Sequence, residues 1–309
     1  MTTPGGAAGR RPIVNTKVVS LWVLFLPSAV LLFVFSYLPL YGALIAFKNY
    51  SPYLGVWKSP WVGLANLRDF LLNPYFWNVL RNTVLLSLLD MLFGFTAPIL
   101  FALLANEIAS SRYKRTVQTI SYLPHFLSWV VVAGLFKQIL SPTNGLVNQA
   151  LGAVLNLPSV FFFIEPRFFR PLVVAAEIWK STGYSAILYF ATIAGIDRGL
   201  YEAAYIDGAS RLRQAYHVTL PGMVPIILLM FLLRISGIFN VGFERIFLFQ
   251  SPAVYEVSEV ISVYVYRLGL QGGLYSLTSA IGLVQSTLGF ILLVAANRLS
   301  QTYGKLGLY

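Results

Sequence analysis

Long blocks of apolar residues constrain this chain more than any other feature of its sequence. Six segments carry the roughly 20 apolar residues that a helix needs to cross a hydrocarbon core about 30 Å thick. They lie at about 19–47, 77–105, 117–140, 171–196, 223–243 and 274–297. Only 11% of the 309 residues are charged, whereas soluble domains carry about 25%. The sequence therefore predicts an all-α integral membrane protein, a bundle of six spans with tails at 1–18 and 298–309.

The distribution of lysine and arginine predicts how these spans are oriented, because cytoplasmic segments carry an excess of both residues. One side receives both tails, the loop after the second span and segment 197–222, with Arg10, Arg11, Lys17, Arg112, Lys114, Arg115, Arg198, Arg211, Arg213, Arg298 and Lys305. The longer loops on the other side hold Lys48, Lys58, Arg68, Arg167, Arg245 and Arg267. We therefore expect both termini and segment 197–222 on the cytoplasmic side.

The sequence lacks the usual signatures of an enzyme or a metal protein. It contains no cysteine, which excludes disulfides, thiol catalysis and Cys-ligated metal. It contains no phosphate-binding G-x-x-x-x-G-K-[ST] loop, no H-E-x-x-H and no G-x-S-x-G. The net charge of +11 is spread over short connecting segments and does not form the basic patch of a nucleic-acid-binding protein. We expect no catalytic residue, no metal, no cofactor and no nucleic-acid partner.

One long polar stretch, "YEAAYIDGASRLRQAYHVTLPGM" at 201–223, interrupts the apolar pattern. Asp197 and Ser210 are suited to begin two short helices as N-caps. Gly208 supplies the left-handed backbone position that ends the first helix, and Pro221 is predicted to close the second. A plain connection needs only a handful of residues, so this segment is predicted to dock a cytosolic partner.

The residues of this stretch resemble the EAA loop of ABC importer permeases. The matching positions are Glu202, Ala203, Ala204, Asp207, Gly208, Leu220 and Pro221, and the one departure is Val218, where isoleucine is usual. The stretches "FVFSYLPLYGALIAFKNYSP", "VGLANLRDFL" and "RNTVLLSLLD" extend the resemblance to MalF-like carbohydrate permeases, in particular the LplB-like polysaccharide and oligosaccharide subgroup.

This resemblance implies the MetI/MalF-like type I importer fold, with segment 197–222 as the coupling loop. It implies a multi-pass permease of the bacterial plasma membrane that imports an oligosaccharide or polysaccharide fragment. Its partners would be two ATP-binding subunits that hydrolyse ATP, a second, similar but distinct permease, and an external solute-binding protein. The same machinery for a non-sugar solute, and an ion-coupled secondary transporter, remain alternatives.

Polar groups inside the predicted spans are candidates for a substrate pathway, since intramembrane charges normally face a bundle interior or a cavity. Helical spacing predicts a polar stripe on the fourth span, where Glu177 and Lys180 could pair. The pathway candidates are Glu177, Lys180, Ser181, Tyr184, Asn82, Asn240 and Gln285. Asp90 and Arg234 are predicted to form a structural pair across two helices.

Overall fold

The computed structural model describes the backbone of residues 16–304 and the side chains of residues 20–298 and 301. The described residues form helices and no strand, apart from one isolated bridge between Lys48 and Trp61. Residues 1–15 and 305–309, which are most of the proposed N-terminal tail and the end of the proposed C-terminal tail, lie outside the described residues.

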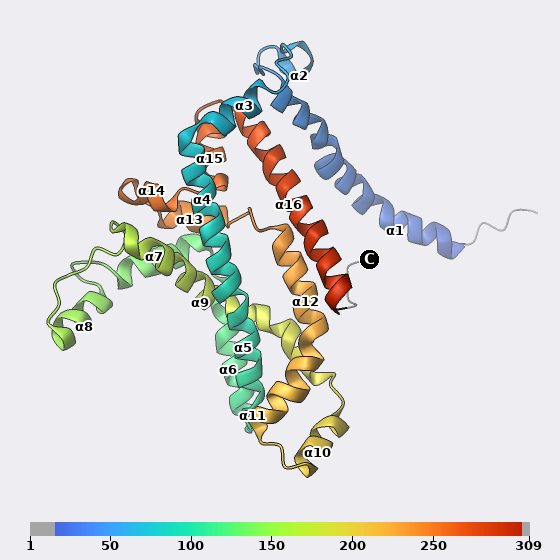
Figure 1. Ribbon diagram of the computed structural model, residues 1–309, viewed down its shortest axis with the longest axis vertical. Coiled ribbons are helices and arrows are strands. Elements are labelled where there is room, and N and C mark those ends of the chain that lie inside the picture. The colour runs from blue at the N-terminus through green and yellow to red at the C-terminus, as the bar shows by residue number, and fades with distance from the viewer. Residues whose placement is uncertain (1–15, 305–309) are drawn as a thin grey trace, which may run out of the picture.

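Within the described residues, four helical segments are each long and apolar enough to cross a membrane. They are Ser20–Phe47, Pro74–Asn106, Arg211–Ser236 and Tyr275–Arg298. They include all of α4 (Pro74–Leu89), α5 (Thr96–Asn106), α11 (Arg211–Gln214) and α12 (Leu220–Ser236), and most of α1 (Thr16–Leu32) and α16 (Tyr275–Gly304). In Figure 1, α4 and α5 run down the molecule while α1 projects away from it. These four segments correspond to the first, second, fifth and sixth predicted spans.

The third predicted span, 117–140, is not one straight helix. It consists of α6 (Ser111–Tyr122), a short 3-10 turn and α7 (Trp129–Ile139), bent by 103°. Pro124 lies in the turn, and the Ser128 hydroxyl begins α7 by accepting from the Val131 N–H. At the break, Lys180 Nζ donates to the His125 carbonyl at 2.6 Å. A broken helix is tolerated where a neighbour satisfies the freed backbone groups in this way.

The fourth predicted span, 171–196, lies within α9 (Pro166–Ala194), a helix of 29 residues. α9 is not among the four helices that are apolar enough on their own, because it carries Glu177 and Lys180 in its interior. Its length suffices for a span, since 29 residues extend roughly 43 Å. The contacts of its polar residues are described below.

The fifth predicted span, 223–243, begins and ends earlier than expected. The helix runs from Arg211 to Ser236, so Pro221 does not close it. A π-helical turn, Ala215–Thr219, precedes α12, and the Leu220 N–H donates to the Ala215 carbonyl. Pro221 therefore occupies the first turn of α12, where its missing N–H breaks no α-helical bond. At the other end α12 stops before Gly237.

Short helices join the long ones at both ends of the molecule (Figure 1). α10 (Arg198–Ile206) lies with α11 at one end, and α2 (Gly55–Lys58) and α3 (Ala65–Leu72) lie at the opposite end. The remaining helices are α8 (Leu146–Leu155), α13 (Phe243–Phe249), α14 (Tyr255–Ser258) and α15 (Ile261–Val265). The stretch between the fifth and sixth predicted spans thus folds into short helices where the sequence pattern predicts only a loop.

α9 lies at the centre of the packing. One buried cluster joins it to α7 and α13 through Val173, Val132 and Phe249, and another joins it to α5 and α12. α6 approaches α9 so closely that a Cβ added at Gly183 would lie 2.1 Å from the Ser121 carbonyl oxygen. The helix that carries the polar stripe is therefore held by neighbours on several sides.

Candidate functional site

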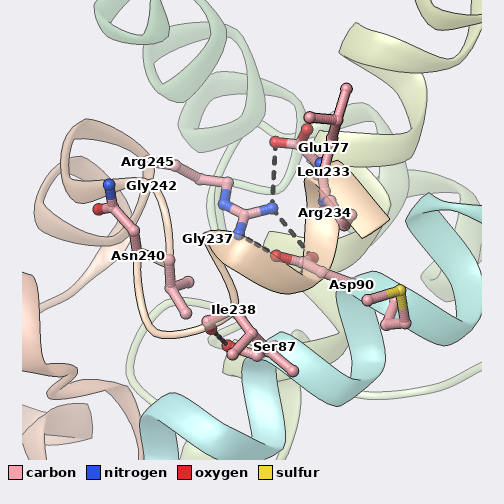
Figure 2. A pocket seen from close by; sticks show the side chains of 12 residues that line it. Ser87, Asp90, Glu177, Leu233, Arg234, Gly237, Ile238, Asn240, Gly242 and Arg245 are labelled. Atoms are coloured by element: carbon pink, nitrogen blue, oxygen red, sulfur yellow. Dashed lines mark hydrogen bonds and ion pairs between the residues drawn. The ribbon is translucent and has the colours of Figure 1, made fainter. Parts of the chain in front are cut away.

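A buried arginine holds together three helical elements in the middle of the molecule. Arg245 of α13 is 2% exposed, and its Nη2 lies 2.5 Å from Asp90 Oδ2, in the π-helical turn between α4 and α5. Arg245 Nη1 lies 3.1 Å from Glu177 Oε2 of α9. Burial acts to lower the pKa of Arg245, but the Asp90 and Glu177 carboxylates outweigh it, so the pKa is raised above its ordinary value. The guanidinium stays charged, and the three side chains form one ionic cluster (Figure 2).

This cluster corrects two sequence predictions. Asp90 pairs with Arg245 and not with Arg234, and Glu177 also pairs with Arg245 and not with Lys180. The sequence pattern places Arg245 in an outer loop and gives it no partner, because nothing in the linear pattern shows that α13 folds back against α9. Lys180 is buried, donates to the His125 carbonyl and lies 5.5 Å from the Trp129 ring centroid.

A cavity of about 330 Å³ lies against the ionic cluster. It is lined by the four charged residues Asp90, Glu177, Arg234 and Arg245, together with Ser87, Met91, Leu233, Gly237, Ile238, Asn240, Val241 and Gly242. The Ser87 hydroxyl donates to the Ile238 carbonyl and so fixes the chain just after α12. Figure 2 shows the cluster joined by dashed lines, with Arg234 beside it and joined to none of the residues drawn.

A second cavity, of about 530 Å³, is lined by α9, α12, the turn that leads into α5 and the first turn of α5. Leu233 and Arg234 line both cavities. The second cavity also has Tyr184, Ser185 and Tyr189 in its wall. The two cavities therefore meet at the C-terminal part of α12.

The four residues of the predicted polar stripe on α9 do not all face the same site. Glu177 lines the first cavity and Tyr184 the second. The Tyr184 ring stacks on His125 with ring centroids 3.8 Å apart. Ser181 is partly buried and lines neither cavity. Lys180 donates its hydrogen bond to the His125 carbonyl at the break between α6 and α7. Two of the four stripe residues thus reach a cavity.

The three amide candidates have different positions. Asn82 is 1% exposed; it donates to the Glu256 carbonyl at 2.8 Å and accepts from Arg170 Nη2 at 2.9 Å. It joins helices and lines neither of the two cavities described above, so its place in a pathway stays a prediction. Gln285 Nε2 donates to the Phe239 carbonyl at 2.9 Å, whereas Asn240 is exposed and lines the first cavity.

Segment 197–222 forms the short helix α10 and the start of the helix that contains α12. The Asp197 carboxylate accepts from the Gly199 N–H at 2.9 Å and so begins α10. Gly208 has φ +75°, and its N–H donates to the Tyr205 carbonyl while the Ala209 N–H donates to the Ala204 carbonyl. These two bonds form the Schellman motif that ends a helix at a left-handed glycine. The Ser210 hydroxyl then accepts from the Arg213 N–H at 3.4 Å and begins α11.

The candidate coupling residues lie along an open surface of this segment. Glu202, Ala203, Asp207, Gly208 and Pro221 are exposed, whereas Ala204 and Leu220 are partly buried. The Tyr201 hydroxyl lies 2.9 Å from Thr219 Oγ1, and Arg211 donates to the Glu107 carbonyl at 3.2 Å. α10 is therefore connected to the helix that contains α12, and the first residue of that helix is connected to the end of α5.

Comparison with known protein families gives a match over most of this chain. Residues 94–304 match the family of binding-protein-dependent transport system inner membrane components. The chain belongs to this family. The match includes α9, segment 197–222 and α12, together with Glu177 and Arg245 of the ionic cluster.

Two relatives from Bacillus subtilis (strain 168) match the chain over nearly its whole length. Protein LplB is 40% identical over 289 residues, covering 94% of this chain and 91% of that protein. The polygalacturonan/rhamnogalacturonan transport system permease protein YteP is 38% identical over 289 residues, and the match covers 94% of this chain and 90% of that protein.

Two solved structures share the fold. One, of a bacterial ABC transporter that imports the acidic polysaccharide alginate, matches with a TM-score of 0.86 at 39% identity, over 93% of this chain and 97% of that chain. The other is of a bacterial alginate ABC transporter in complex with a periplasmic protein bound to an alginate pentasaccharide. It matches with a TM-score of 0.88 at 38% identity, over 95% of this chain and 98% of that chain. The fold is that of an ABC importer permease, as the sequence predicted.

Proposed function

We propose that this chain is the permease subunit of a binding-protein-dependent ABC importer that moves fragments of an acidic polysaccharide across the bacterial plasma membrane. Its membership of the permease family supports the transport role. The names of YteP and of the alginate importers support an acidic sugar chain as substrate. Both termini would lie in the cytoplasm, in keeping with the lysine and arginine bias.

The single observation that carries the coupling role is the exposed, capped helix α10. Large apolar side chains lie exposed on and beside it, with Tyr205 at 76%, Ile206 at 83% and Leu212 at 81% exposed. An exposed apolar group of this kind, bordered by the Glu202 and Asp207 carboxylates, is suited to a protein partner. That partner would be one of two ATP-binding subunits, which would perform the ATP hydrolysis.

The helix Arg211–Ser236 offers a direct route from this surface to the cavities. Tyr201 of α10 contacts Thr219 of that helix, just before α12 begins, and Arg234 near its far end lines both cavities. The two ends of this helix, Arg211 and Arg234, lie roughly 35 Å apart at 1.5 Å per residue. A movement of α10 driven by an ATPase would therefore shift the wall of the proposed substrate pathway.

A second permease would cover the first span. None of the most apolar 18-residue part of Ser20–Phe47 is buried within this chain, and α1 projects away from the other helices (Figure 1). A similar but distinct chain is the proposed partner. The solute-binding protein would dock at the opposite end from α10, on the loops around 48–76, 141–169 and 244–273.

Uptake by the purified complex in vesicles tests this function. With ATP on the side of the ATPase subunits and binding protein on the other, we expect uptake of oligogalacturonates or alginate oligosaccharides that stops when ATP is omitted. Uptake driven by a proton or sodium gradient without ATPase subunits would contradict the importer mechanism. Uptake of neutral oligosaccharides alone would contradict the substrate class.

A further inference from the structure

Arg234 is a cation at the junction of two cavities that has no ionic partner within the described part of this chain. Its guanidinium makes no ion pair and no side-chain hydrogen bond to any described residue, and it is exposed. A charged side chain in a membrane span is costly and normally has a partner. The expected partner, Asp90, is already bound to Arg245 at two atoms.

The ionic cluster leaves Arg234 as the cation that an incoming anion can reach. Arg245 is 2% exposed and is enclosed by Asp90 and Glu177, so its donors on that side are occupied. Arg234 projects into the same cavity and also lines the second one. Volumes of about 330 and 530 Å³ fall in the range of about 300–1,000 Å³ that is usual for ligand sites.

The surroundings of Arg234 leave room for a planar anion. A Cβ added at Gly94 would lie 3.9 Å from Arg234 Nη2, so the glycine leaves open space beside the guanidinium. A guanidinium binds a carboxylate through two parallel hydrogen bonds, which an ammonium group cannot reproduce. Asn240 in the first cavity and Ser185 in the second add groups that can bond sugar hydroxyls.

We propose that Arg234 is a specificity-determining residue of the substrate pathway, where it binds the carboxylate of each sugar-acid unit as the chain passes from one cavity to the other. This inference rests on the proposed import function and adds to it the group that selects acidic units. Asp90, Glu177 and Arg245 act here as positioning residues, since their mutual pairing leaves the Arg234 guanidinium free.

The test is uptake of trigalacturonate and of its methyl ester by the complete complex in vesicles, with ATP turnover measured in parallel. In Arg234→Met we expect uptake of the acid to fall about tenfold or more, as for loss of a charge-assisted hydrogen bond, with ATP turnover within about twofold of wild type. Arg234→Lys keeps the charge but loses the paired geometry, and should recover part of the uptake. Arg115→Met, which removes an exposed arginine of α6 outside both cavities, is the matched control.

A third variant tests the same idea without removing the charge. Gly94→Leu would fill the space beside Arg234 and should lower uptake of the acid while the protein remains folded, because leucine is a better helix former than glycine.

The outcomes separate the two proposals. The proposed role of Arg234 is wrong if wild type imports trigalacturonate and Arg234→Met imports it at a rate within twofold of wild type. It is also wrong if Arg234→Lys imports the acid no faster than Arg234→Met. In both cases the importer function stands. Equal loss of acid and ester uptake in Arg234→Met would also overturn carboxylate selection. If wild type imports the ester and not the acid, the acidic substrate class itself is wrong.

Discussion

Replacement of Arg245 by methionine would test the ionic cluster at the centre of the molecule. The substitution leaves the Asp90 carboxylate, 9% exposed, and the Glu177 carboxylate, 19% exposed, without their cation. Breaking a buried pair by removing one partner costs about 3–5 kcal/mol, because the remaining charge stays buried and uncompensated. We expect the free energy of unfolding of the permease to fall by that amount. Arg234→Met, at an exposed side chain that has no ionic partner in the described part of the chain, should change it by about 0.5 kcal/mol or less.

A double-mutant cycle assigns this loss to the Asp90–Arg245 contact. Unfolding of the purified permease would be followed by tryptophan fluorescence as the denaturing detergent fraction rises. Asp90→Asn and Arg245→Met should be coupled by about 0.5–3 kcal/mol, the range for residues in contact, whereas Asp90→Asn and Arg234→Met should be nearly additive. The reasoning fails if Arg245→Met costs less than about 1 kcal/mol, or if Asp90 couples more strongly to Arg234 than to Arg245.

Three further substitutions test other parts of the structure. Gly208→Val should keep ATP hydrolysis but lose uptake, since a non-glycine residue at φ +75° costs about 1–2 kcal/mol in backbone strain and alters the end of α10. Glu202→Lys, at an exposed position, should leave stability unchanged but reduce the amount of ATPase subunit that co-purifies with the membrane complex. Gly183→Ala should destabilise the permease by about 1–3 kcal/mol, because its Cβ would lie 2.1 Å from the Ser121 carbonyl oxygen; thermal unfolding measures this.

Each of these three has a matched control. Gly208→Asn should retain coupled uptake, because asparagine tolerates the left-handed region; equal activity of the valine variant would argue against the bend. Glu244→Lys changes an exposed carboxylate on α13, far from α10 in Figure 1, and should retain the ATPase. If Glu202→Lys retains it equally well, Glu202 does not contact that subunit. Gly134→Ala meets no atom within 4 Å and should be as stable as wild type.

Local chemistry made parts of the fold predictable. Caps and breakers act within a few residues, so Asp197, Gly208 and Ser210 could be assigned correctly before any tertiary contact was known. The long apolar segments were likewise predictable, because the length of a span follows from the thickness of the bilayer. The family followed from the spacing of the coupling residues, which is a property of the linear chain.

Interruptions of the long helices depended on contacts that the sequence does not display. Pro124 marks a break in the third predicted span, but the 103° bend requires Lys180 of α9 to satisfy the His125 carbonyl. Pro221 looked like a helix end, yet the π-helical turn before it lets the helix continue. In both cases a proline permits two outcomes, and the surrounding backbone hydrogen bonds decide between them.

The sequence by itself determined which segments are apolar enough to cross a membrane and where the helix ends of segment 197–222 lie, since both follow from hydrophobicity and from local capping. Only the tertiary structure decided which charges meet. Asp90, Glu177 and Arg245 lie up to 155 residues apart and come together because α13 folds back against α9. Arg234, between two cavities, is then left without an ionic partner among the described residues. A linear pattern shows that a buried charge needs a partner, but the choice among several cations depends on distances that exist only after the helices have packed.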